Sequence, residues 1–211
     1  MSLSAEQSEL RALSYPLYLC TSFAPLSNQP VLQDLLSLSC QLTEAVIQPS
    51  EQMLKAIRVQ WWVECIRDLQ RQNSPLSDRI IHHIDSGAIN KETLLLILEG
   101  FQEATFEENP KKHLKRCWGL IFEYYFAITG TNLDGSLSVI GSVLSEILYF
   151  PIDKFNNSII EDELNVIHSI KSKDGFIKSC THLAYLSRDN KLINQTLLPM
   201  RLRPSRTSFC C

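Results

Sequence analysis

Apolar residues recur at intervals of three and four along almost the entire chain, which is the spacing of one face of an α-helix. Glycine is scarce, with seven in 211 residues, and no pair of short alternating β-branched runs flanks a hairpin turn. The clearest stripe comprises Leu114, Trp118, Ile121, Phe122, Tyr125 and Ile128. The pattern therefore predicts an all-α fold with about nine helices in a single domain.

Capping residues and prolines mark the expected helix boundaries. Ser74-Pro75 and Asn109-Pro110 each place a capping residue before a proline at the first helical position, and Asn90 can cap the helix between them. Further helices are expected from stripes at Val31, Leu35, Leu38, Leu42 and Val46; at Leu54, Ile57, Trp61, Cys65 and Leu69; at Leu94, Ile97, Leu98 and Phe101; at Leu137, Ile140, Leu144 and Leu148; at Leu164, Ile167 and Ile170; and at Ile177, Cys180 and Leu183.

Composition disfavours several classes of function. Lys and Arg total 20 against 23 Asp and Glu, so the formal charge is −3, whereas nucleic-acid binders usually carry a basic excess. No apolar run reaches the roughly 18 residues needed to span a bilayer. The N-terminal segment resembles neither a secretory signal nor a transit peptide, and an odd number of scattered cysteines favours free thiols. We therefore expect a soluble intracellular protein.

Motifs for metal and nucleotide binding are absent from the sequence. Neither H-E-x-x-H, C-x-x-C nor a glycine-rich phosphate loop occurs, and the adjacent His82 and His83 diverge by about 100° on a helix. A basic cluster, Lys111, Lys112, His113, Lys115 and Arg116, opens the strongest helix, where positive charge opposes the helix dipole. Three interpretations stay open for this cluster: contact with phosphate, contact with an anionic membrane surface, or a solvated face.

Several segments, in order along the chain, resemble the squalene/phytoene synthase family. Ala56 to Ile66 (AIRVQWWVECI) resembles the family's Arg- and Trp-bearing helix, and Tyr18 to Pro25 resembles its opening helix and Phe-x-Pro turn. Further similarities lie at Leu35 to Cys40, Gly119 to Gly130, Val139 to Gly141 and Asn194 to Met200. The resemblance spans about residues 15 to 200 and implies a single-domain isoprenoid-synthase-like helical bundle.

The family's enzymes join two allylic diphosphates, using two Asp-rich clusters that face each other and hold Mg²⁺. The resemblance places the first cluster at residues 44 to 48, where this chain has Glu44 and the neutral Gln48. It places the second after Gly141, where Glu146 is the only acid between residues 142 and 150. Because isolated carboxylates hold a hydrated divalent ion poorly, we expect no catalytic residue, no metal and no cofactor. Glu44 and Glu146 are then vestigial candidates.

This pattern most resembles the family's non-catalytic branch of alphaproteobacterial proteins and mitochondrial complex I assembly factors. The resemblance implies protein partners, with respiratory-complex subunits as candidates, and a ligand pocket for an isoprenoid or lipid lined by Glu44, Gln48, Arg58, Trp62 and Glu146. It also implies at most peripheral membrane contact and no nucleic acid. We expect residues 1–14 to form an N-terminal helix or extension, 15–200 the family-like domain and 201–211 a disordered basic tail.

Two alternatives remain beside this hypothesis. The first is an active Mg²⁺-dependent prenyl transferase, a transferase of the squalene/phytoene synthase type, in which Glu44 and Glu146 share one cavity. The second is an unrelated helical interaction scaffold. For the resemblance to the non-catalytic branch, the N-terminal segment favours a bacterial cytoplasmic protein, and the alternative location is the mitochondrial matrix, in association with the inner membrane.

Overall fold

The computed structural model describes residues 5–70, 74–129, 137–150, 165–167 and 175–188. These ranges contain nine α-helices of seven or more residues and no β-strand, which confirms the predicted all-α bundle. The helices are α1 (Ala5–Leu13), α2 (Tyr15–Thr21), α3 (Gln29–Ile47), α4 (Gln52–Asp68), α5 (Pro75–Asp85), α6 (Lys91–Ala104), α7 (Lys111–Thr129), α8 (Leu137–Tyr149) and α10 (Gly175–Arg188). The expected tail at 201–211 lies outside the described residues.

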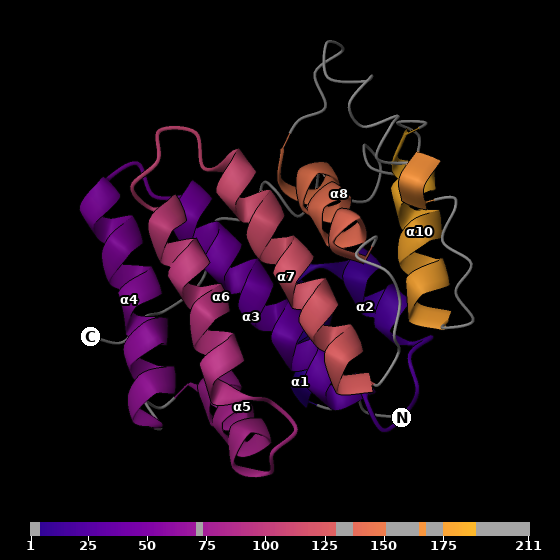
Figure 1. Cartoon of the computed structure of the whole chain (residues 1–211), viewed down its shortest axis with the longest axis horizontal. Helices are drawn as coiled ribbons and strands as arrows, with labels where there is room; N and C mark the ends of the chain where they lie inside the picture. Colours follow the sequence, from indigo (N-terminus) through magenta and orange to yellow (C-terminus); the bar gives the residue numbers. More distant parts are fainter. Residues whose placement is uncertain (1–4, 71–73, 130–136, 151–164, 168–174, 189–211) are drawn as a thin grey trace.

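The helices form one packed bundle in which neighbours along the chain are mostly neighbours in space. Contacts join α4 to α6, α6 to α7, α7 to α8 and α8 to α10, so these five helices follow one another across the molecule (Figure 1). Short connections reverse the chain between α3 and α4 and between α6 and α7. The end of α3, the start of α4, the end of α6 and the start of α7 therefore lie at the same end of the bundle (Figure 1).

Helix α3 is the centre of the bundle. It packs against α1, α2, α4, α5, α6 and α7, and most of its length is buried, including the polar side chains of Gln33, Asp34, Ser39 and Thr43. Ser39 and Thr43 donate their hydroxyl hydrogens to carbonyls one turn earlier, those of Leu35 and Ser39. A helix this deeply buried needs such partners, because an unpaired polar group away from water costs free energy.

Two features of the helix ends agree with the expected signals. Pro75 begins α5 directly after Ser74, but the Ser74 side chain makes no capping hydrogen bond. The side chain of Asn90 does, accepting from the backbone N–H of Thr93 at 2.9 Å. The Asn90 cap satisfies one of the donors that the first turn of α6 leaves unpaired.

The expected apolar face of α4 was correct for Cys65 but wrong for Leu54 and Ile57. The buried residues are Val59, Trp62, Val63, Cys65 and Ile66, whereas Leu54 and Ile57 are 40% and 58% exposed. Apolar residues occur on almost every side of this helix, so its sequence is compatible with more than one buried face. Packing against α3 and α6 selects the one that contains Trp62.

Among the described helices, none is both long and apolar enough to cross a membrane.

Candidate functional site: the α7–α8 face and its surroundings

Close backbone contact fixes how α7 and α8 pack against each other. A Cβ atom on Gly141 of α8 would stand 2.2 Å from the carbonyl oxygen of Trp118, and one on Gly119 of α7 would stand 3.0 Å from that of Ser138. The two glycines let the antiparallel helices approach closely. The same register places the first turns of α7 opposite the last turns of α8, which brings Lys111 and Lys115 to Glu146.

Glu146 is a buried carboxylate with two lysine partners. Its side chain is 6% exposed; Lys115 Nζ donates to Oε2 at 2.9 Å, and Lys111 Nζ forms an ion pair with Oε1. Burial acts to raise the pKa of Glu146, but the hydrogen bonds and charges of the two lysines outweigh it and lower the pKa below its ordinary value. The carboxylate is therefore ionised at neutral pH, with both of its oxygens occupied.

An open groove of about 460 Å³ lies beside this ion pair. It is lined by Asn109, Lys111, Lys112, Lys115, Arg116 and Ser142. Four of the six lining residues are cationic and none is acidic. The Asn109 side chain also accepts a hydrogen bond from the backbone N–H of Lys111 at 3.3 Å, which places this residue at the start of α7. The groove thus combines positive charge with polar amide and hydroxyl groups, the groups that bind anions.

Glu44, the acid expected in the first cluster, lies in a different electrostatic environment. It is half-buried on α3, and burial raises the pKa of its carboxyl. Burial also raises the pKa of Tyr149 on α8, and Cys40 and Glu44 raise it further. Among the described residues, Glu146 forms ion pairs with two lysines, whereas Glu44 forms none.

Trp118 of α7 lies between these two segments. Its indole N–H donates to the Thr43 hydroxyl at 2.9 Å, next to Glu44, and its ring packs against Tyr149 with centroids 5.8 Å apart. The indole is fully buried. The space between the two segments at this level is thus occupied by an aromatic side chain that is hydrogen-bonded in place.

The remaining residues expected to line a pocket are distributed more widely. Gln48 is exposed at the end of α3, and Arg58 is half-buried on α4. Trp62 is buried on α4 and packs edge-to-face with Trp61 at 4.8 Å. Helix α4 lies on the opposite side of the bundle from α8 (Figure 1). The structure therefore brings Glu44 and Glu146 toward Trp118 and Tyr149 but places Arg58 and Trp62 on a helix remote from Glu146.

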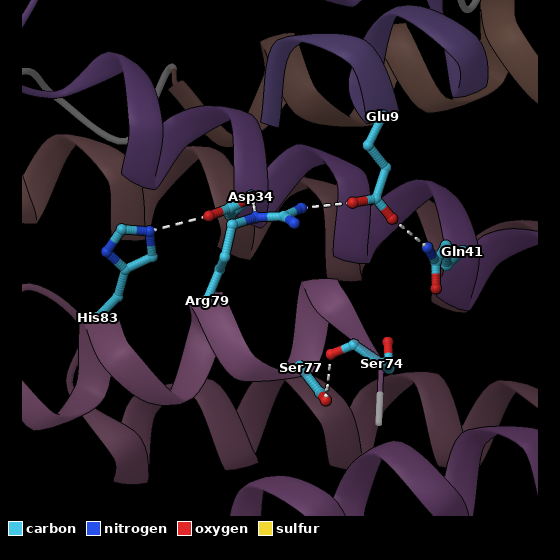
Figure 2. Close-up of polar contacts among 7 residues, drawn as sticks. All are labelled: Glu9, Asp34, Gln41, Ser74, Ser77, Arg79 and His83. Carbon is cyan, nitrogen blue, oxygen red and sulfur yellow. Dashed lines mark hydrogen bonds and ion pairs between the residues drawn. The ribbon is translucent and has the colours of Figure 1, made fainter. Parts of the chain in front are cut away.

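A second charged cluster was missed by the sequence reasoning. Asp34 on α3 is fully buried. One of its oxygens accepts a hydrogen bond from Arg79 Nε at 2.8 Å, and the other pairs with His83 Nε2 at 2.9 Å (Figure 2). Arg79 also pairs with Glu9 of α1, whose second oxygen accepts from Gln41 Nε2 at 2.9 Å. The only sequence signal was an isolated aspartate within an apolar helix.

Because both oxygens of Asp34 and of Glu9 are engaged, we assign this cluster a stabilising role. It ties α1, α3 and α5 together through charge-assisted hydrogen bonds, which are stronger than neutral ones.

The cysteines of the described part are buried free thiols. These are Cys20, Cys40, Cys65, Cys117 and Cys180. Burial raises the pKa of Cys40 and of Cys117 to about 12, so both are neutral thiols at physiological pH. A neutral buried thiol is a poor nucleophile, in agreement with the structural role expected from the sequence. Among the described side chains, no group of three or more His, Cys, Asp or Glu residues is arranged to hold a metal ion.

No family model, curated protein or solved structure matches this chain.

Proposed function

We propose that this protein is a non-catalytic binding protein on an isoprenoid-synthase-like helical scaffold, and that it acts through protein partners. The proposal combines the sequence resemblance to the squalene/phytoene synthase family with the surroundings of Glu146. Assembly of a respiratory complex is the specific role that the resemblance suggests. The observation that carries the non-catalytic part is the pairing of Glu146 with Lys111 and Lys115.

Electrostatics explains why this pairing argues against a magnesium site. Two ammonium groups flank one carboxylate, so the described residues around Glu146 carry a positive charge before any divalent ion arrives. A divalent ion about 4 Å from one ammonium group would experience a repulsion of about 8 kcal/mol at an effective dielectric constant near 20. Mg²⁺ also requires several oxygen ligands in an octahedral arrangement. Both Glu146 oxygens are already used by the lysines.

The test is an incubation of the full chain with farnesyl and geranylgeranyl diphosphates in the presence of Mg²⁺. We expect no release of diphosphate and no coupled isoprenoid product. Product formation that is lost in both Glu44→Gln and Glu146→Gln variants would contradict the proposal and support the alternative, a magnesium-dependent prenyl transferase. Glu99→Gln, which changes an exposed acid on α6, is the matched control.

The assembly role has a separate test in the cells that make the protein. Deletion of the gene is expected to lower the amount of assembled respiratory complex on native gels, and the wild-type chain and the Glu146→Gln variant are each returned to the deletion strain. An unchanged amount of every respiratory complex after deletion would contradict the assembly role. Restoration by the Glu146→Gln variant would further indicate that the function does not depend on a metal-binding carboxylate.

A further inference from the structure

The first two turns of α7 carry more positive charge than the ion pairs with Glu146 use. Lys111, Lys112, Lys115 and Arg116 all lie within six residues and all line the groove beside α8. Among the described residues, the four cationic side chains face one carboxylate, that of Glu146, which pairs with Lys111 and Lys115. Within the described part of the chain, Lys112 and Arg116 are exposed and form no ion pair.

This arrangement is unfavourable for the helix itself. Cations near a helix N-terminus oppose the macrodipole, typically by about 0.3–1 kcal/mol each. The pairs Lys111–Lys115 and Lys112–Arg116 are also like charges four residues apart, which repel each other. Helix stability therefore does not account for the cluster, and an anion in the groove would offset both costs.

We propose that the groove between the start of α7 and α8 binds a phosphate-bearing ligand without a metal ion, with Lys112 and Arg116 as its principal cationic contacts. The Ser142 hydroxyl and the Asn109 amide line the same groove and supply neutral donors. Lys111 and Lys115 contribute their charge while they remain paired with Glu146. This inference rests on the proposed function in one respect, since the ligand is bound and not converted.

The groove is open to solvent, so a ligand there is recognised by its charge at the cationic lining more than by enclosure. Two kinds of ligand carry the phosphate group that the groove is proposed to bind. One is a soluble phosphate or diphosphate compound, and the other is the headgroup of an anionic phospholipid. The formal charge of −3 for the whole chain argues against a polyanion such as nucleic acid, whose binding needs a more extended basic surface.

The experiment measures binding of two probes to the full chain in buffer containing EDTA. Inorganic pyrophosphate is titrated by calorimetry at low and at high salt. In parallel, the protein is sedimented with phosphatidylcholine vesicles that contain or lack phosphatidic acid. We expect binding to at least one phosphate-bearing probe, weakening as salt increases. Saturable pyrophosphate binding indicates a soluble ligand, and retention only on phosphatidic acid vesicles indicates a lipid headgroup.

The decisive variant is Lys112→Gln/Arg116→Gln, which removes two exposed charges without breaking an ion pair between described residues. Affinity for the bound probe is expected to fall at least about tenfold, because two charge-assisted hydrogen bonds are lost. The matched control is Arg67→Gln/Lys178→Gln, which removes two exposed charges from α4 and α10 and should leave affinity unchanged. Thermal melting should show the groove variant to be at least as stable as the wild type.

Two results would overturn the inference: no binding of either probe by the wild-type chain, or equal affinity in the groove variant and the wild type. These results are distinguishable from a failure of the proposed function. Turnover of an isoprenoid diphosphate with Mg²⁺ would refute the non-catalytic role, and it is measured in a different assay that contains no EDTA.

Discussion

Replacing Glu146 by glutamine tests whether the lysine pairing stabilises the fold. The change keeps the shape of the side chain but removes the negative charge that Lys111 and Lys115 share. Loss of one partner from a fully buried ion pair costs about 3–5 kcal/mol, and loss from an exposed pair costs about 0–1 kcal/mol. The carboxylate is 6% exposed, whereas the lysines are 24% and 18% exposed and can turn toward solvent. We therefore expect Glu146→Gln to lower the free energy of unfolding by about 1–3 kcal/mol at pH 7.

The pH dependence of this stability difference between the wild type and the Glu146→Gln variant provides a second, independent test. The pKa of Glu146 is lower in the folded than in the unfolded protein, so its contribution to stability is present above the unfolded-state value. That contribution is lost as the pH falls through the folded-state pKa. The wild type and the Glu146→Gln variant should therefore differ at neutral pH and converge in acid.

Urea denaturation followed by circular dichroism at 222 nm, repeated from pH 7 into the acid range, measures both quantities. The Glu99→Gln control should change stability by less than about 0.5 kcal/mol. A stability of the Glu146→Gln variant equal to or above that of the wild type at pH 7, or a difference that does not change with pH, would refute the electrostatic argument.

Three further predictions use the same denaturation assay. Glu44→Gln should raise the free energy of unfolding at pH 7 by about 0.5 kcal/mol or more. Burial raises the pKa of Glu44 in the folded protein, so the wild type loses stability as the pH rises past the pKa of Glu44 in the unfolded chain, and the variant does not. A variant less stable than the wild type at pH 7 would contradict this. Asp34→Asn should lower the free energy of unfolding by about 2–4 kcal/mol, since Arg79 and His83 lose a fully buried charged partner. As the control, Asp68→Asn changes an exposed acid and should lower it by less than about 0.5 kcal/mol. Gly141→Ala should lower the free energy of unfolding by about 1–3 kcal/mol, because the new methyl group meets the Trp118 backbone. The control is Gly100→Ala, where the nearest atom is the Cys117 sulfur at 2.9 Å, which belongs to a side chain that can move. A smaller loss for Gly141→Ala than for Gly100→Ala would contradict the observed α7–α8 register.

The order and approximate bounds of the helices follow from the sequence because local signals determine them. Pro75 at the first turn of α5 and Asn90 at the cap of α6 act within a few residues of their own position. The buried face of α4 could not be predicted in the same way, since apolar residues surround that helix. Its orientation depends on packing against α3 and α6, which involves residues distant along the chain.

The candidate site was predictable only in part. The sequence analysis singled out Glu44 and Glu146 as candidates, and the basic cluster was evident as a charge run. The contact between that cluster and Glu146 depends on the register of α7 against α8, which the close approach at Gly119 and Gly141 determines. The cluster of Glu9, Asp34, Arg79 and His83 likewise joins three helices, and no spacing along the chain predicts such a contact.

The most direct measurement of the central claim is a crystal structure of the protein soaked with a non-hydrolysable farnesyl diphosphate analogue and excess Mg²⁺. The account predicts that Lys111 and Lys115 remain on Glu146, that no metal ion binds this carboxylate, and that any ordered diphosphate contacts Lys112 and Arg116. Ordered Mg²⁺ ions that bridge the diphosphate to Glu44 and Glu146, with the lysines displaced, would contradict it.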